Sequence, residues 1–131
     1  MNVVDSCGWL EYFSNGSNAD FFAPVLEDTE NLLVPALVVY EVCKRVALQR
    51  GAAAATSAAD FMAQGTPVAF DAGTALNAAL YAATHKLALT DSLILQSAKE
   101  HGALLWTQDA DLKGHEGVKY TAKRHNDFNS P

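Results

Sequence analysis

Four acidic side chains fall where distant segments of this sequence are expected to meet. Asp5 directly follows a short apolar run near the N-terminus, and Asp109 closely follows another late in the chain. Asp91 stands at the start of a predicted helix, and Glu41 lies about two turns into a different one. If the two strands are parallel neighbours, their carboxyl ends share one edge, and the helices leaving that edge begin there. The sequence therefore predicts that four carboxylates converge.

Such a cluster needs something to offset its charge. Two bare carboxylates about 4 Å apart repel by roughly 1 kcal/mol in water-like surroundings, and by roughly 4 kcal/mol at an effective dielectric constant of 20. Divalent cations prefer oxygen ligands, so they relieve this repulsion. The four acids therefore indicate a site for a divalent cation.

Glu41 allows two interpretations. At 100° per residue it falls between Leu37 and Leu48 and beside Arg45, so an acid lies within an apolar stripe. A surface ion pair with Arg45 would stabilise the helix by only about 0.2–0.5 kcal/mol. Alternatively, Glu41 belongs to the cation site, because an acid on an inward stripe is costly without a partner. The helix pattern alone leaves both open.

Strands alternate with helices along the whole chain. Strands are expected at residues 3–4, 32–34, 68–70, 103–106 and 118–120. Helices are expected at residues 7–13, 17–26, 35–50, 52–64, 71–83 and 90–101, with Pro35 as a first helical residue. This alternation implies an α/β layer fold with a mainly parallel sheet of roughly five strands.

Several helix ends and faces are specific expectations. Thr90 and Asp91 form a helix start, because a hydroxyl or carboxylate can accept the free N–H groups there. Asp71 caps another helix, and Ser17 or Asn18 a third. The helix at 71–83 carries an apolar set, namely Ala75, Leu76, Ala79, Leu80 and Ala83.

Composition narrows the class of protein. The 131 residues, half of them apolar, suit one domain over 1–131, with a polar tail at about 121–131 that is expected to fray. No run is long and apolar enough for a membrane span, and no signal pattern opens the chain. Cys7 and Cys43 are expected to be reduced, buried side chains of a cytoplasmic protein. The net charge of −6 argues against a simple cationic nucleic-acid binder.

The motifs around these acids resemble those of the PIN domain, and most closely the VapC toxin ribonucleases of VapBC toxin–antitoxin modules. Their order and spacing match over nearly the whole chain. The matching segments are Val4-Asp5-Ser6, Glu41 within VVYEVCKR, Asp91 within LALTDSLILQSAKEHGALL, and Thr107-Gln108-Asp109-Ala110-Asp111. Two departures are Leu112, where an aromatic residue is usual, and Thr90, where a small apolar residue is commoner.

This resemblance implies a three-layer α/β/α fold and a metal-dependent endoribonuclease that uses Mg²⁺ or Mn²⁺. Its acid cluster would consist of Asp5, Glu41, Asp91 and Asp109, with Asp111 as an additional acid. Ser6 and Thr107 would orient the carboxylates beside them. The resemblance further implies an RNA substrate, a homodimer, and a small antitoxin whose tail covers the site. Metal ions suit phosphodiester hydrolysis, because they stabilise charge on the attacking and leaving oxygens.

The remaining polar side chains have more ordinary explanations. The four histidines are scattered near predicted helix ends or in loops, where surface or capping roles are expected rather than metal binding; they are His85, His101, His115 and His125. Several basic residues could line an RNA groove or simply form solvated surface; they are Lys44, Arg45, Arg50, Lys86 and Lys113.

Three alternatives to a toxin remain. A housekeeping PIN nuclease would carry the same acids. A PIN fold that only binds a partner would have no need to retain them. A receiver-like signalling domain also places acids at strand ends, but it would need paired acids after the first strand, where this chain has Asp5-Ser6.

Overall fold

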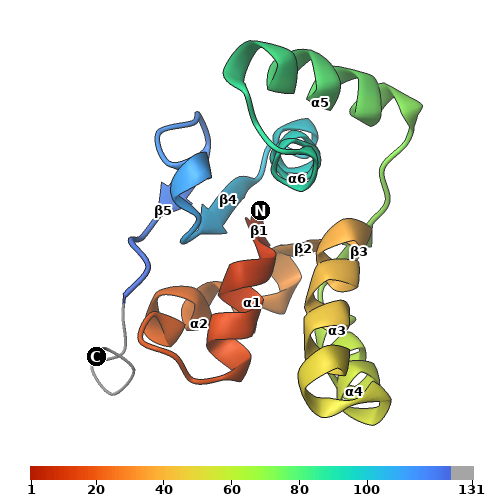
Figure 1. The fold of residues 1–131 in the computed structure, drawn as a ribbon, viewed down its shortest axis with the longest axis vertical. Helices are drawn as coiled ribbons and strands as arrows, with labels where there is room; N and C mark the ends of the chain where they lie inside the picture. Colours follow the sequence, from red (N-terminus) through yellow and green to blue (C-terminus); the bar gives the residue numbers. More distant parts are fainter. Residues whose placement is uncertain (125–131) are drawn as a thin grey trace.

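Five short strands form one parallel sheet in residues 1–124, the part of the chain that this computed structural model describes (Figure 1). The strands are β1 (Asn2–Val4), β2 (Leu32–Pro35), β3 (Thr66–Val68), β4 (Leu104–Thr107) and β5 (Val118–Tyr120). Their order across the sheet is β3-β2-β1-β4-β5, and each neighbouring pair is parallel. The predicted α/β fold with a mainly parallel five-stranded sheet is confirmed.

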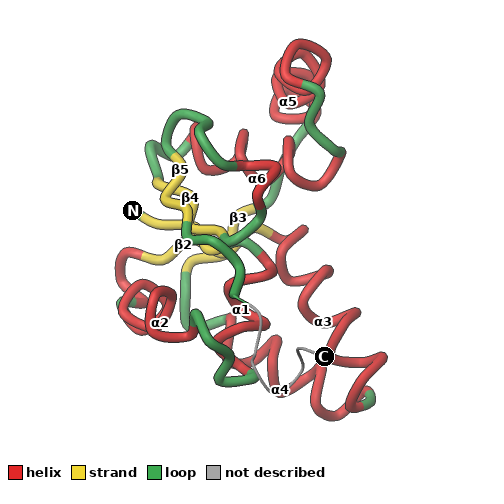
Figure 2. The backbone as a smooth tube through the Cα atoms, turned by 60° about the vertical axis from the view of Figure 1, so that its left-hand side comes forward, coloured by secondary structure: helices red, strands yellow, loops and turns green. Residues whose placement is uncertain are grey.

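Helices cover both faces of this sheet. They are α1 (Ser6–Phe13), α2 (Ala19–Glu27), α3 (Ala36–Arg50), α4 (Ala52–Met62), α5 (Ala72–His85) and α6 (Leu89–Glu100), with 3₁₀ turns η1 (Thr29–Asn31) and η2 (Ala110–Leu112). Figure 2 shows α5 and α6 on one side of the sheet and α1 and α2 on the other. Within the described residues, no helix is both long and apolar enough to cross a membrane.

The central strand explains why the first acid is buried. β1 pairs with β2 on one side and with β4 on the other, and Val3 and Val4 are 1% and 0% exposed. Trp9, from the helix that follows, is also buried. Asp5 therefore leaves the most enclosed strand of the sheet and enters a helix that is anchored in the core.

Two strands differ slightly from the sequence prediction. β3 covers Thr66–Val68 and not 68–70, so Pro67 lies inside it. This proline is tolerated because β3 is an edge strand, where a missing N–H need not break a ladder hydrogen bond. β4 covers Leu104–Thr107, one residue later than expected. The later end places Thr107 inside the sheet, two residues before Asp109.

The starts of two helices also differ from the sequence prediction. α6 begins at Leu89 with Ala88 as its N-cap, so Thr90 and Asp91 lie in its first turn and do not cap it. Pro35 ends β2 and is the N-cap of α3, not its first residue. The Asp71 cap is confirmed, since its Oδ1 accepts from the Thr74 N–H at 3.0 Å. Asn18 occupies the N-cap position of α2, but its side chain makes no capping hydrogen bond.

The predicted inward position of Leu48 is wrong, and two leucines of α5 are also exposed. Leu48 is 76% exposed, and Leu76 and Leu80 are each 60% exposed. α5 packs on α6 as an outer helix, and its buried positions are Thr74 and Ala78. Because a helix packed on another helix can bury only a narrow stripe, Thr74 and Ala78 face inward and the leucines of α5 do not.

The start of the predicted tail is anchored. The Thr121 N–H donates to the Thr107 carbonyl at 3.1 Å, and the Ala122 carbonyl accepts from Asn18 Nδ2 at 2.9 Å. The expectation of fraying from residue 121 is therefore wrong for these two residues. The rest of the predicted tail from residue 125, including His125, lies outside the described residues.

Candidate active site

Asp5 is held rigidly at the carboxyl end of β1. It is the N-cap of α1, and its Oδ1 accepts from the Ser6 N–H at 2.8 Å. Its Oδ2 accepts from the Thr107 hydroxyl at 2.9 Å and lies 3.7 Å from the Cys7 thiol. With 3% of its surface exposed, this carboxylate is fixed in one orientation.

Thr107 joins the ends of the two central strands. Its hydroxyl donates to Asp5 and accepts from the Asp109 N–H at 2.9 Å, and the residue is fully buried. One side chain on β4 thus positions the carboxylate after β1 and the backbone that carries Asp109. Asp109 is further held because its Oδ1 accepts from the Asp111 N–H at 2.9 Å.

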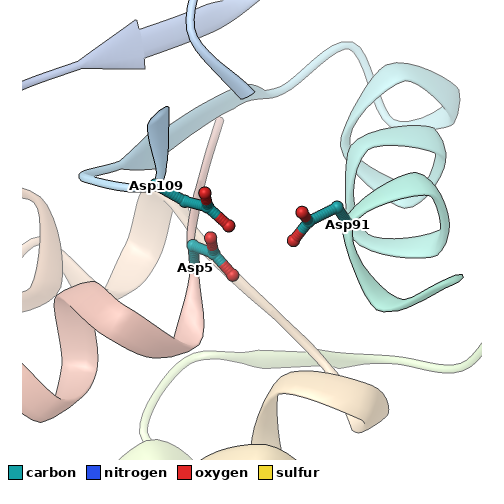
Figure 3. A group of neighbouring side chains, drawn as sticks. All are labelled: Asp5, Asp91 and Asp109. Carbon is teal, nitrogen blue, oxygen red and sulfur yellow. The ribbon is translucent and has the colours of Figure 1, made fainter. Parts of the chain in front are cut away.

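Asp91 faces these two acids from the first turn of α6 (Figure 3). One carboxylate oxygen from each of Asp5, Asp91 and Asp109 lies within 4.8 Å of the others. Asp91 is 8% exposed. We call these three residues the acid cluster. They come from two strand ends and one helix start, as parallel topology requires.

Burial and like charge disfavour ionisation of two members of the acid cluster, Asp91 and Asp5. Burial, followed by the charges of Asp109 and Asp5, raises the pKa of Asp91 to about 7. Burial also raises the pKa of Asp5, although the hydrogen bonds from Thr107 and Ser6 oppose this rise. The charge of Asp111 also raises the pKa of Asp91, so the charges named here all oppose ionisation of that carboxyl.

Glu41 lies beside the acid cluster and outside it. Burial and the charges of Asp5 and Asp109 raise its pKa, while hydrogen bonding from the side chains of Ser6 and Thr90 lowers it. The residues that shift the pKa of Glu41 therefore belong to the site or adjoin it. Arg45, by contrast, is exposed on the helix surface. Thr90, a departure from the family pattern, is one of the side chains that act on Glu41.

Ser6 and Asp111, which were predicted to support the site, act on different acids. Ser6 contacts Asp5 through its backbone N–H and acts on Glu41 through its side chain. Asp111 is exposed and reaches the site through its backbone bond to Asp109 and its charge on Asp91.

Sequence reasoning missed several neighbours of the site. Cys7 lies beside Asp5 and Thr107, and burial followed by the Asp5 charge raises its thiol pKa to about 12. This thiol stays protonated and is a poor nucleophile or metal ligand. Asn18 and Gln108 form a buried hydrogen bond behind Asp109. Gln108 adjoins a predicted acid, but Asn18 lies ninety residues away and gave no signal.

The acid cluster fits a divalent cation. Its donors are three oxygen ligands of the kind that Mg²⁺ and Mn²⁺ prefer. A cation would remove the repulsion that now raises the pKa of Asp91. These donors include no thiolate or imidazole, so the site offers only oxygen ligands to a metal ion.

Comparisons with known proteins concern the family and the fold of this chain. The family model of the PIN domain matches residues 3–117. No curated protein matches the chain by sequence.

Solved structures share the fold. A toxin–antitoxin complex from Klebsiella pneumoniae contains a chain that is 18% identical, with a TM-score of 0.76 and coverage of 91% of this chain and 96% of that one. VapBC2 from Rickettsia felis, bound to a promoter DNA fragment, gives 14% identity, a TM-score of 0.69 and coverage of 92% and 97%. Mycobacterium tuberculosis VapC20, described as a sarcin–ricin loop cleaving toxin, gives 14% identity, a TM-score of 0.71 and coverage of 90% and 98%. At such identities the likeness concerns the fold.

Proposed function

This chain belongs to the PIN domain family, and we propose that it is a metal-dependent endoribonuclease, the toxin of a type II toxin–antitoxin module. The observation that carries the proposal is the convergence of Asp5, Asp91 and Asp109 within 4.8 Å. Structural similarity to chains of toxin–antitoxin complexes supports the toxin role. The proposed reaction is hydrolysis of RNA phosphodiester bonds in the cytoplasm.

The chain's own residues would prepare this site for Mg²⁺ or Mn²⁺. Asp5, Asp91 and Asp109 would hold the cation, which supplies charge stabilisation at the attacking and leaving oxygens. Thr107 and the Ser6 N–H fix Asp5, so little reorganisation is needed when substrate binds. Glu41 acts at the same site, either as a further oxygen ligand or as acceptor of a proton from the attacking water.

An apolar groove between α1 and the α3–α4 hairpin suits the antitoxin. Its volume is about 550 Å³, and Leu10, Phe13, Val46 and Phe61 are among its lining residues. Arg50 lies at the same groove and could pair with an acidic side chain. We propose that an amphipathic segment of a small antitoxin binds here, from where its tail could reach the acid cluster.

The outer face of α5 suits the homodimer that the family resemblance implies. Leu76 and Leu80 are exposed there, and α5 carries no Asp, Glu, Lys or Arg. A two-fold interface places a surface against itself, so a surface without acidic or basic side chains avoids opposing like charges. Light scattering of the wild type and of Leu80→Glu tests this proposal, which predicts a dimer and a monomer respectively.

RNA cleavage tests the proposed function directly. Purified protein should cut RNA with Mg²⁺ or Mn²⁺ and stop when the metal is chelated. Induced expression, followed by mapping of RNA 5′ ends, would identify the cut site. A toxin should arrest growth when it is expressed, and co-expression of a neighbouring small gene should relieve that arrest. This result would favour a toxin over a housekeeping nuclease. Metal-dependent cleavage by the wild type excludes a PIN fold that only binds a partner.

A further inference from the structure

A pocket of about 470 Å³ opens beside the acid cluster. Its lining includes Asp109, Gln108, Tyr120 and Lys123. This volume lies within the roughly 300–1,000 Å³ of pockets that bind small molecules. Because Asp109 belongs to both the acid cluster and the pocket wall, a molecule bound in this pocket lies next to the acid cluster.

The walls of this pocket are held in place. Asn18 is 3% exposed, and its Nδ2 donates to Gln108 Oε1 and to the Ala122 carbonyl, each at 2.9 Å. One buried amide therefore joins the segment after β4 to the segment after β5. The Thr121 N–H makes a second link to the Thr107 carbonyl. Because hydrogen bonds fix the segments on both sides of the pocket, the pocket is suited to holding a ligand in one position.

Aromatic and cationic groups meet at this pocket. The Lys113 ammonium lies 5.6 Å from the centroid of the Tyr120 ring, and Lys123 lines the same pocket. In a chain of net charge −6, Lys113 and Lys123 thus bring two positive charges to the pocket that Asp109 lines. Single-stranded nucleic acids are bound by aromatic stacking combined with a cationic path for the backbone.

We propose that this pocket binds the nucleotide next to the scissile phosphate, with its base stacked on Tyr120 and its far phosphate near Lys123. The proposal rests on the proposed ribonuclease function and adds the substrate class, a single-stranded or unpaired RNA segment. A base paired in a helix is not free to stack on a side chain in the pocket. Tyr120 is thus a substrate-binding residue, and the acid cluster performs the chemistry.

Steady-state cleavage of a short, fluorescently labelled single-stranded RNA tests the role of Tyr120. Tyr120→Ala should raise KM by about 5- to 150-fold, the factor that corresponds to a stacking contribution of about 1–3 kcal/mol per base. Its kcat should stay within about threefold, because the acid cluster is intact. Tyr120→Phe should behave as wild type, since it keeps the ring. Melting temperatures of each variant check that the fold is retained.

A matched control is available on α3. Tyr40 is 60% exposed, and the Lys44 ammonium lies 5.9 Å from its ring centroid, so it presents the same pair of groups away from this pocket. Tyr40→Ala should leave KM unchanged. Lys123→Ala should raise KM and reduce the slope of log affinity against log salt by about one.

Removing the base from the RNA tests which partner Tyr120 contacts. An abasic nucleotide on one side of the cut should raise KM for the wild type as much as Tyr120→Ala does, and should add little in that variant. An unchanged KM for Tyr120→Ala, or equal abasic penalties in both proteins, would overturn the subsite while cleavage itself stands. If the wild type cuts no RNA with either metal, the proposed function fails. In that case the affinity for a single-stranded oligonucleotide tests the subsite separately. Equal affinities of the wild type and Tyr120→Ala would overturn the subsite.

Discussion

The acid cluster and a second group of titratable side chains differ in how they are satisfied. The second group joins α5, α6 and the loop before β5, and we call it the Tyr81 cluster; its members are Tyr81, His85, Lys99 and His115. The Tyr81 ring stacks on His85 with centroids 3.9 Å apart, and the Lys99 ammonium lies 3.7 Å from the same ring centroid. The Tyr81 hydroxyl is hydrogen-bonded to His115 Nδ1.

Each member of the Tyr81 cluster has a complementary partner. Burial and the Glu116 charge raise the Tyr81 pKa, so its hydroxyl keeps its proton and can donate to His115. His85 Nδ1 also bonds to the Tyr81 carbonyl at 3.0 Å. In the acid cluster, by contrast, burial and then the like charges of Asp109 and Asp5 raise the pKa of Asp91. A complementary cluster stabilises a fold by itself, whereas a buried cluster of like charges at a strand edge is typical of a functional site.

The largest predicted effect is loss of cleavage on removing one acid. Asp5→Asn, Asp91→Asn or Asp109→Asn each replaces a charged oxygen ligand with a neutral amide of similar shape. Since charge stabilisation by the cation contributes several kcal/mol, cleavage should fall on the order of a thousandfold. Single-turnover RNA cleavage with saturating Mn²⁺ measures this. Full activity in folded Asp91→Asn would remove that residue from the site.

Glu41→Gln should also reduce cleavage, by one or two orders of magnitude, with little change in stability. The reason is that its neighbours are Asp5, Asp109, Ser6 and Thr90. Turnover and thermal melting of this one variant are the measurements. A loss of a few tenths of a kcal/mol with intact cleavage would instead mean that Glu41 only pairs with Arg45.

The raised pKa of Asp91 predicts a pH dependence for the metal-free protein. Its carboxyl is protonated in the folded state up to about pH 7, but an unfolded chain loses that proton near pH 4. Between these values the unfolded state binds fewer protons, so stability should fall as pH rises from about 4 to 7 and then level off. Asp5 and Glu41 act in the same direction. In the presence of a chelator, the melting temperature of Asp91→Asn should depend less on pH than that of the wild type.

Metal binding should show the opposite trend. A carboxylate ligand must lose its proton, so Mn²⁺ affinity and cleavage should rise with pH up to about 7. Calorimetric titration at two pH values measures the affinity. An affinity that does not change across this range would mean that Asp91 is not a ligand.

The smallest predicted effect concerns the Tyr81 cluster. Tyr81→Phe keeps the stacking on His85 and removes only the hydrogen bond to His115. It should lower the free energy of unfolding by about 0.5–1.5 kcal/mol, the usual contribution of one hydrogen bond. Cleavage should be unaffected, and denaturant melts with cleavage assays check both points. A loss of cleavage would link the two clusters and contradict the comparison.

The sequence was sufficient to bring Asp5, Asp91 and Asp109 together because topology constrains them strongly, but it also placed Glu41 among them, and Glu41 lies beside that group. Apolar runs without alternation indicate buried parallel strands, and acids just beyond such runs must share an edge. This reasoning brought Asp5 and Asp109 together across a separation of more than a hundred residues. It needed no knowledge of the exact strand ends, so the one-residue shift of β4 did no harm.

Contacts on the outside of the domain could not be predicted in the same way. The leucines of α5 form an apolar stripe that looks like a core face, but α5 lies outside α6 and buries only Thr74 and Ala78. Leu48 was misplaced because α3 extends beyond its buried positions, which end at Val42. The pocket at Tyr120 depends on Asn18 reaching Ala122, and no local pattern indicates such a contact.

Thermal melting of the wild type and Asp109→Asn, first in chelator and then with Mn²⁺, tests the central claim that the acids form one cation site. Mn²⁺ at a hundredfold excess over its dissociation constant should stabilise the wild type by about 2.7 kcal/mol, a rise of roughly 5–15 °C. Asp109→Asn should melt higher than wild type in chelator, because repulsion is relieved, and should gain less from Mn²⁺. If the variant melts lower without metal and still gains the full Mn²⁺ shift, the acids do not share a cation.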